Sequence, residues 1–279
     1  MQNLSDITAI ARSVAWGAVD ILRAYYRGET LAVEQKKEGP VTAADIAVNR
    51  YILDRFKAEL GDRDFGYLSE ETYKGSQAVI EKPGVWIIDP LDGTRDFIEK
   101  TGEYAIHLAL IENHRPILSV VALPESDKVY WALRGKGTWV STRTGQTDPV
   151  QVSSKTAIAD LGLVASRTHR DNRLDAILAK LPTKDTQFVG SVGCKIVTIV
   201  EQHADIYISL SGKSAPKDWD MAAPELILTE AGGKMTHADG SPLQYNTGDV
   251  SQWGCIVASN GHCHAEICQR AIATLAEFE

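Results

Sequence analysis

The chain has 279 residues, enough for one large domain or two modest ones, each with its own core. Hydrophobic residues make up 44% of it and charged residues 24%, ordinary globular values that exclude wholesale disorder. The formal net charge of −8 excludes a general electrostatic attraction to a nucleic-acid polymer or an anionic membrane. Any phosphate must therefore be bound by local groups or through a metal ion.

Targeting and disulfide signals are absent from the sequence. No apolar run approaches the ~18 residues of a transmembrane helix, and the N-terminus lacks the basic region and cleavage site of a signal peptide. The four cysteines are too few for a disulfide scaffold and are expected to be reduced thiols. We expect a cytoplasmic protein without a membrane partner, and both monomer and homodimer stay open.

The first half of the chain predicts two helices followed by a sheet. Apolar residues recur at three- and four-residue spacing through residues 7–22 and again from Thr42 to Gly61, while residues 28–40 form a charged loop or hairpin between them. Short apolar runs separated by turn residues then predict an antiparallel meander, with strands at 84–89, 104–112, 116–123, 127–133 and 138–141.

Beyond about residue 150 the pattern alternates, which is typical of a parallel-type α/β layer. We expect strands at 161–165, 187–189, 205–209 and 254–258, and helices at 172–181, 192–202, 221–231 and from about 261. The sequence thus predicts an N-terminal α+β half (1–150) packed on a C-terminal α/β half (151–279), with a site between them.

The chemically informative segment is Trp-Ile-Ile-Asp-Pro-Leu-Asp-Gly-Thr, residues 86–94. A buried strand is expected to end at Asp89, because Pro90 stops it, and Asp92 follows three residues later. The two carboxylates and the backbone carbonyl of Leu91 can therefore converge on one point. Oxygen ligands without a nearby His or Cys favour Mg²⁺ or Mn²⁺ over zinc.

The next two residues, Gly93 and Thr94, begin a predicted helix, so their backbone amides would face an anion. The alternative is a capped turn between strand and helix, since Asp-Pro and Asp-Gly are common turn dipeptides.

Three further acidic residues lie at the ends of predicted elements. Glu70 follows a strand at 65–68, Asp45 opens a helix after Thr42, and Asp220 precedes a helix that ends in Glu-Ala-Gly-Gly. Alone, each has a structural alternative: a solvated surface pair, an N-cap, or a charge that complements the helix dipole.

Together, these motifs resemble the inositol-monophosphatase-like superfamily of metal-dependent, lithium-sensitive phosphatases. They occur in family order and at family-like spacing, and the resemblance extends from residue 5 to about 275. It implies a layered αβαβα sandwich of the inositol monophosphatase/fructose-1,6-bisphosphatase type, with an antiparallel sheet in the N-terminal half.

The resemblance also implies a mechanism with two to three Mg²⁺ ions, Mn²⁺ as a substitute and Li⁺ as an inhibitor. One ion activates a water, a second stabilises the leaving oxygen, and Asp89 bridges them. Thr94 and Asp45 orient and deprotonate the water, and the amides of Gly93 and Thr94 hold the phosphate. The implied metal ligands are Glu70, Asp89, Leu91 (through its carbonyl), Asp92 and Asp220.

Within the superfamily, the residues after Asp-Gly-Thr resemble the 3′(2′),5′-bisphosphate nucleotidase (CysQ-type) branch. Arg95-Asp-Phe-Ile carries Asp96 where that branch has Glu, and the Ser-Arg-Thr-His and Gly-Ser-Val-Gly-Cys-Lys segments also match. The branch implies removal of the 3′-phosphate of adenosine 3′,5′-bisphosphate, giving AMP, in sulfur assimilation. The implied substrate contacts are Gly93, Thr94, Ser166, His169, Ser191 and Lys195.

Two other functions stay open on the sequence. An inositol-1-monophosphatase or related sugar-phosphate phosphatase would use the same carboxylates. A catalytically silent metal- or nucleotide-binding protein is expected to have lost a ligand, yet all five ligand positions are present here. The histidines and cysteines between His262 and Cys268 look like a metal tract, but the family places nothing catalytic there, and we expect them to be structural.

Overall fold

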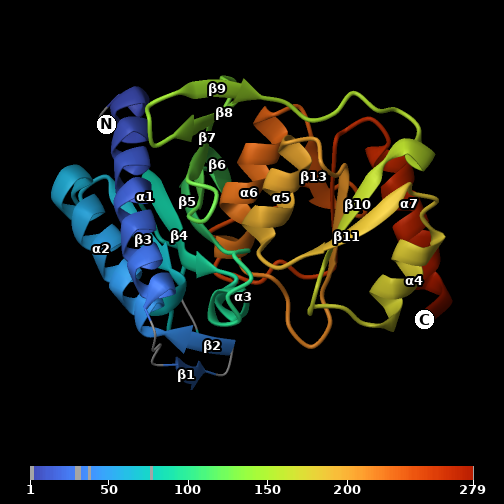
Figure 1. The fold of residues 1–279 in the computed structure, drawn as a ribbon, viewed down its shortest axis with the longest axis horizontal. Coiled ribbons are helices and arrows are strands. Elements are labelled where there is room, and N and C mark those ends of the chain that lie inside the picture. Colours follow the sequence, from blue (N-terminus) through green and yellow to red (C-terminus); the bar gives the residue numbers. More distant parts are fainter. Residues whose placement is uncertain (1–2, 29–32, 37–38, 76–77, 279) are drawn as a thin grey trace.

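Two large sheets alternate with three layers of helices (Figure 1). The computed structural model describes residues 3–28, 33–36, 39–75 and 78–278. One outer layer holds α1 (Leu4–Arg27) and α2 (Ala43–Leu60), the middle layer holds α5 (Val192–Val200) and α6 (Asp218–Glu230), and the other outer layer holds α4 (Asn172–Lys180) and α7 (His264–Leu275). This arrangement confirms the expected αβαβα sandwich.

The N-terminal sheet has seven strands in the order β3-β4-β5-β6-β7-β8-β9, with β3 parallel to β4 and every other pair antiparallel. The predicted meander is confirmed, but β9 was missed because its four residues are mostly exposed and carry no apolar alternation. The strands are β3 (Phe65–Ser69), β4 (Gly84–Asp92), β5 (Ala105–Glu112), β6 (Arg115–Leu123), β7 (Lys128–Leu133), β8 (Thr138–Thr142) and β9 (Thr147–Val150).

The C-terminal sheet has five strands in the order β11-β10-β12-β14-β13. Its first three strands are parallel, as expected, but β14 runs antiparallel to both of its neighbours, so the sheet is mixed. The short strand β13 was not predicted, since only two of its four residues are buried. The strands are β10 (Gly162–Ser166), β11 (Asp185–Val189), β12 (Ile206–Leu210), β13 (Lys234–His237) and β14 (Cys255–Ser259).

Short elements complete the chain. The strands β1 (Val33–Lys36) and β2 (Gly39–Thr42) pair antiparallel, which agrees with a hairpin between the first two helices, although residues 29–32 and 37–38 lie outside the described residues. The other short elements are η1 (Glu70–Thr72), α3 (Thr94–Ile98), η2 (Ile158–Asp160) and η3 (Ala276–Phe278). Among the described residues, no helix combines the length and apolar character that crossing a bilayer requires.

Strand β4 is buried on both faces, and its packing determines the direction of the acidic side chains at its C-terminal end. Trp86 packs on the layer of α1 and α2, stacking with Phe56 at 4.3 Å, whereas Val85 and Ile87 pack on the middle layer. Because side chains alternate along a strand, Asp89 continues the row of Val85 and Ile87 and faces α6. The apolar residues that fix β4 therefore also fix the direction of its first carboxylate.

The prediction that Pro90 ends this strand was wrong. β4 continues to Asp92, with an irregular register: Asp89 pairs with His107 and Asp92 with Ala105, so two residues of β4 oppose one of β5. Such a bulge leaves a residue out of the ladder, and a proline is tolerated there because it has no N–H to donate.

The expected histidine–cysteine cluster lies at the start of α7. His264 is buried, its Nδ1 lies 2.8 Å from the hydroxyl of Ser259, and its Nε2 lies 2.8 Å from that of Thr236. Cys263 contacts the carbonyl oxygen of Thr156 at 2.9 Å. These contacts support the structural interpretation of the cluster. All four cysteines are free thiols.

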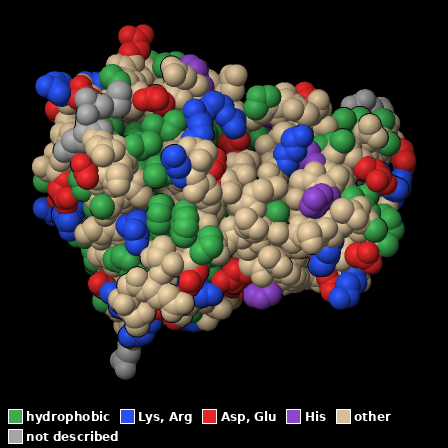
Figure 2. Space-filling view, turned by 90° about the horizontal axis from the view of Figure 1, so that it is seen from above, with side chains coloured by type: hydrophobic (Ala, Val, Ile, Leu, Met, Phe, Trp, Pro, Cys, Tyr) green, Lys and Arg blue, Asp and Glu red, His purple; other side chains and the backbone are tan. Residues whose placement is uncertain are grey.

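The acidic net charge is not gathered on the face seen from above. Figure 2 shows Lys and Arg side chains interspersed with Asp and Glu over that face, and no broad region of one sign covers it.

Candidate active site

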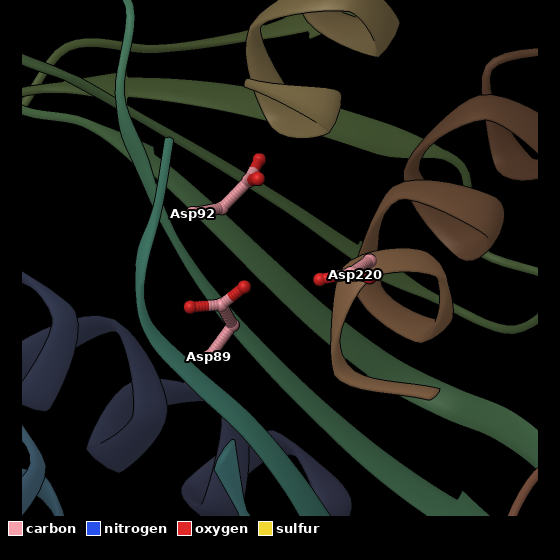
Figure 3. A group of neighbouring side chains, drawn as sticks. All are labelled: Asp89, Asp92 and Asp220. Carbon is pink, nitrogen blue, oxygen red and sulfur yellow. The ribbon is translucent and has the colours of Figure 1, made fainter. Parts of the chain in front are cut away.

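Three carboxylates converge between the N-terminal sheet and the middle helices. Asp89 and Asp92 come from the end of β4 and Asp220 from the first turn of α6, and one oxygen of each lies within 4.8 Å of the others (Figure 3). Residues 128 positions apart in the sequence thus form one group of oxygen ligands. Hard divalent cations prefer such donors.

Helix α6 begins three residues earlier than the sequence indicated, so Asp220 lies inside its first turn and not before it. Lys217 is the N-cap residue, and its backbone N–H donates to the Asp220 carboxylate at 2.6 Å. The start was misplaced because a lysine is not a typical N-cap residue and Asp220 caps the helix from within. A carboxylate here is also favoured by the positive end of the helix dipole.

Glu70 joins the group from the neighbouring strand. Because β3 and β4 are parallel, their carboxyl ends lie at the same edge of the sheet, and Glu70 is the first residue after β3. Its side chain shares a hydrogen bond with that of Asp89, which requires a proton on one of the two carboxyl groups. The structure therefore brings together four of the five implied metal ligands through their side chains, and Leu91 lies between Asp89 and Asp92 on β4.

The crowded carboxylates have strongly shifted pKa values. Burial and then the charges of Asp220 and Glu71 raise the pKa of Glu70 well above its ordinary value. Burial and the charge of Glu70 do the same to the pKa of Asp89. Burial and the charge of Asp92 raise the pKa of Asp220 to about 7. Like charges that repel in a buried site are the electrostatic pattern that a bound cation relieves.

Asp92 behaves in the opposite way. Burial alone would raise its pKa, but the charge of His107 and hydrogen bonds from Ser191 and Gly193 lower the pKa of Asp92 to about 2. The surroundings of Asp92 therefore favour its charged form, unlike those of Glu70, Asp89 and Asp220.

Asp45 and Thr94 form a separate pair beside this group. The Asp45 carboxylate accepts from the Thr42 backbone N–H at 2.7 Å and from the Thr42 hydroxyl at 2.5 Å. The Thr94 hydroxyl lies 3.2 Å from the other Asp45 oxygen and 3.2 Å from the Leu91 carbonyl oxygen. Asp45 can therefore accept a proton from Thr94, which leaves the threonine oxygen free to accept one in turn.

Gly93 has a backbone that only glycine adopts readily, with φ of +92°. A Cβ added there would lie 2.9 Å from the Glu103 carbonyl oxygen and 3.1 Å from the Ser191 Cβ. The turn after Asp92 is therefore packed closely against the C-terminal half.

Four of the expected substrate contacts, Ser166, His169, Ser191 and Lys195, come from the C-terminal half of the chain. Ser166 accepts from the His169 backbone N–H at 3.1 Å, and His169 is exposed. Partial desolvation and the charges of Lys195 and Arg95 lower the pKa of His169, so both cations lie near it. Ser191 donates its hydroxyl to Asp92. Lys195 is only 2% exposed and donates to the carbonyls of two residues that precede it, Gly190 and Ser191.

Two contacts across the site were missed from the sequence. His107, a lone polar residue within the apolar strand β5, faces Asp92; a buried histidine in such a run is the one signal that could have found it. Arg167 pairs with Asp96 and with Glu103, the latter at 2.5 Å, and so joins the two halves. No local pattern predicts a contact between segments this far apart.

The model of the inositol monophosphatase family matches residues 3–275. The chain belongs to this family. It is 33% identical over 226 residues to the 3′(2′),5′-bisphosphate nucleotidase CysQ of Escherichia coli O157:H7, which covers 81% of this chain and 87% of that protein. It is 31% identical over 244 residues to the CysQ nucleotidase of Buchnera aphidicola, covering 87% of each.

Solved structures of the family share the fold. The Thermotoga maritima IMPase superposes with a TM-score of 0.80 at 21% identity, covering 98% of this chain and 100% of that one. The inositol monophosphatase of Anabaena (Nostoc) sp. PCC 7120 gives 0.77 at 25% identity, with 98% and 97% covered. An IMPase/NADP phosphatase complexed with Mg²⁺ and phosphate gives 0.79 at 22% identity, with 96% and 95% covered.

Proposed function

We propose that the chain is a Mg²⁺-dependent phosphomonoesterase that removes the 3′-phosphate of adenosine 3′,5′-bisphosphate, giving AMP and inorganic phosphate. The convergence of Asp89, Asp92 and Asp220 beside Glu70 carries the proposal. The nucleotidase relatives, at about one-third identity over most of both chains, support the choice of substrate.

The donor set fits Mg²⁺. All side-chain donors are carboxylates, and the raised pKa values of Glu70, Asp89 and Asp220 are the response of a buried acidic group to missing positive charge. Glu70, Asp89 and the Leu91 carbonyl would hold one ion, and Asp89, Asp92 and Asp220 a second. Bound there, the ions would lower the pKa of a water and stabilise the leaving oxygen. Mn²⁺ is an alternative ion, and the Mg²⁺ of a structural relative supports the assignment.

The chain's own residues would orient the attacking water. Thr94 donates its hydroxyl proton toward Asp45, so the Thr94 oxygen presents a lone pair to a water proton. The two hydrogen bonds from Thr42 hold the Asp45 carboxylate still while it accepts. The backbone amides of Gly93 and Thr94 would hold the phosphate oxygens at the start of α3.

Positive charge on the C-terminal side would bind the second phosphate. Desolvation and then the charges of Lys195 and Arg95 lower the pKa of His169, so two cations, Lys195 of α5 and Arg95 of α3, lie near this imidazole. We propose that His169 and Ser166 contact the nucleotide there. Lys195 would act as a buried positive charge, since its ammonium already donates to two carbonyls, and Ser191 would line the same wall.

A substrate panel tests the proposal. Phosphate release is measured from adenosine 3′,5′-bisphosphate, inositol 1-phosphate and fructose 1,6-bisphosphate, each with Mg²⁺ and with EDTA. We expect the bisphosphate nucleotide to give the highest kcat/KM and EDTA to abolish the reaction. A higher kcat/KM for inositol 1-phosphate would instead assign the chain to the inositol phosphatases.

A further inference from the structure

Two segments of the chain, the start of α5 and strand β5, place polar atoms around Oδ2 of Asp92. The Ser191 hydroxyl donates to it, the Gly193 backbone N–H donates at 2.9 Å, and Nε2 of His107 lies 3.3 Å away. The Asp92 side chain is 10% exposed. Among the residues that the structure describes, no hydrogen bond or ion pair engages its other oxygen, Oδ1, which is the atom left for a cation.

We propose that His107 and Ser191 are positioning residues that hold Oδ2 of Asp92 and thereby present Oδ1 to the metal ion. The inference rests on the proposed function only in that it takes these carboxylates to bind a divalent cation. Groups that orient a metal ligand in this way commonly affect metal affinity 10- to 100-fold.

His107 connects the two parts of the ligand set. Its Nδ1 lies 3.1 Å from the carbonyl oxygen of Trp219, the residue before Asp220, while Nε2 faces Asp92. A carbonyl only accepts hydrogen bonds, so Nδ1 is the donor in that contact, and Nε2 also donates to Asp92 only in the doubly protonated ring. The imidazole is fully buried and therefore fixes Asp92 of β4 relative to the first turn of α6.

The space for this ring depends on Gly193. A Cβ added at Gly193 would lie 2.3 Å from Nε2 of His107 and 2.8 Å from the Cβ of Ala105. The first turn of α5 therefore packs directly on the imidazole, as only a glycine allows. This close fit is independent of the hydrogen bonds and shows that His107, Gly193 and Asp92 are placed as one unit.

The Ser191 hydroxyl is used twice. As the N-cap of α5 its oxygen accepts from the Cys194 N–H at 3.1 Å, and its proton is directed to Asp92. One hydroxyl thus ties the start of α5 to the carboxylate. A nucleotide that approached Ser191 would find its proton already donated.

The test is Mn²⁺ binding by isothermal titration calorimetry on the whole chain without substrate. His107→Asn keeps a donor near the position of Nδ1 and removes the Nε2 contact, whereas His107→Gln places a donor near Nε2. We expect His107→Asn and Ser191→Ala to weaken Mn²⁺ binding 10- to 100-fold and His107→Gln to recover part of the loss. At saturating metal, KM for the bisphosphate should stay within twofold of wild type in the two His107 variants.

Ser119→Ala is the matched control, because Ser119 is equally buried but its hydroxyl has no hydrogen-bond partner among the described residues. Thermal unfolding of each variant checks that it is folded, and Ser191→Ala carries the test if the His107 variants are not. Mn²⁺ affinity within twofold of wild type in the folded variants would overturn the inference. A wild type that binds Mn²⁺ but leaves the bisphosphate intact would refute the proposed substrate alone.

Discussion

Without metal, the protein should lose stability as pH rises from about 4 to about 7. The pKa of Asp220 is about 7 in the fold, whereas an aspartate in an unfolded chain titrates near ~4. The folded protein therefore binds this proton more tightly than the unfolded chain does. The stability that the proton contributes is fully present below the unfolded pKa and is lost as pH rises through the folded pKa.

The size of the effect follows from the shift. One pKa unit corresponds to about 1.4 kcal/mol, so a shift of roughly three units is on the order of 4 kcal/mol by pH 8. That is a large part of the 5–15 kcal/mol by which domains are usually stable. Because Asp220 lies close to Asp89 and Glu70, whose pKa values are also raised, the proton lost belongs to the group as a whole.

Asp220→Asn tests this reasoning by urea unfolding in EDTA at pH 5 and pH 8. The asparagine keeps an oxygen for the Lys217 N–H, 2.6 Å from the native carboxylate, so the helix cap survives. We expect the variant to be several kcal/mol more stable than wild type at pH 8 and much closer to it at pH 5. Mg²⁺ should restore the stability of the wild type at pH 8, because a ligand that binds only the folded state stabilises that state. The exposed Asp160 provides the control, Asp160→Asn. A variant less stable than wild type at both pH values would refute the argument.

The remaining predictions concern activity. EDTA should abolish phosphate release and millimolar Li⁺ should slow it, and full turnover in EDTA would exclude the metal mechanism. Glu70→Gln should lower kcat more than Glu71→Gln, because Glu70 shares a hydrogen bond with Asp89; the reverse order would make Glu71 the ligand. Thr94→Val should lower kcat by about 10²- to 10⁴-fold at similar KM, and an effect on KM alone would remove Thr94 from the proton path. Lys195→Ala should raise KM for the bisphosphate about 10- to 100-fold. It should also lower Tm, because the buried ammonium donates to two backbone carbonyls. Equal losses on a substrate without the 5′-phosphate would show that Lys195 serves the fold and not the binding of that phosphate.

The parts of the site that sequence reasoning predicted are those encoded by local pattern. An apolar strand followed by an acidic residue places Asp89, since strand alternation alone decides which face it joins. The parallel pairing of β3 and β4 then puts Glu70 at the same sheet edge. Spacing along one or two elements is enough for these positions, and the family motifs add Asp92 and Asp220.

What could not be predicted depends on pairing between distant segments. The bulge through which β4 continues past Pro90 depends on the pairing with β5, in which two residues of β4 lie opposite one residue of β5. His107 contacts the carbonyl oxygen of Trp219, 112 residues away, and nothing in the apolar run around His107 indicates which segment will face it. The sequence likewise did not indicate that the Lys195 ammonium donates to the carbonyls of Gly190 and Ser191.

Asp96, where the sequence departs from the nucleotidase pattern, shows how such distant contacts constrain a residue. Its carboxylate pairs with Arg167 and accepts the Thr101 hydroxyl at 3.0 Å, so it is held from both halves of the molecule. A Cβ added at Gly190 would lie only 2.1 Å from one of its oxygens. The side chain therefore fills its space completely, and a glutamate, one methylene longer, would have to displace either Gly190 or the pairing with Arg167. Gly190 immediately precedes Ser191, whose hydroxyl donates to Asp92. The shorter aspartate at position 96 therefore leaves the space that the segment from Gly190 to Gly193 needs to reach Asp92.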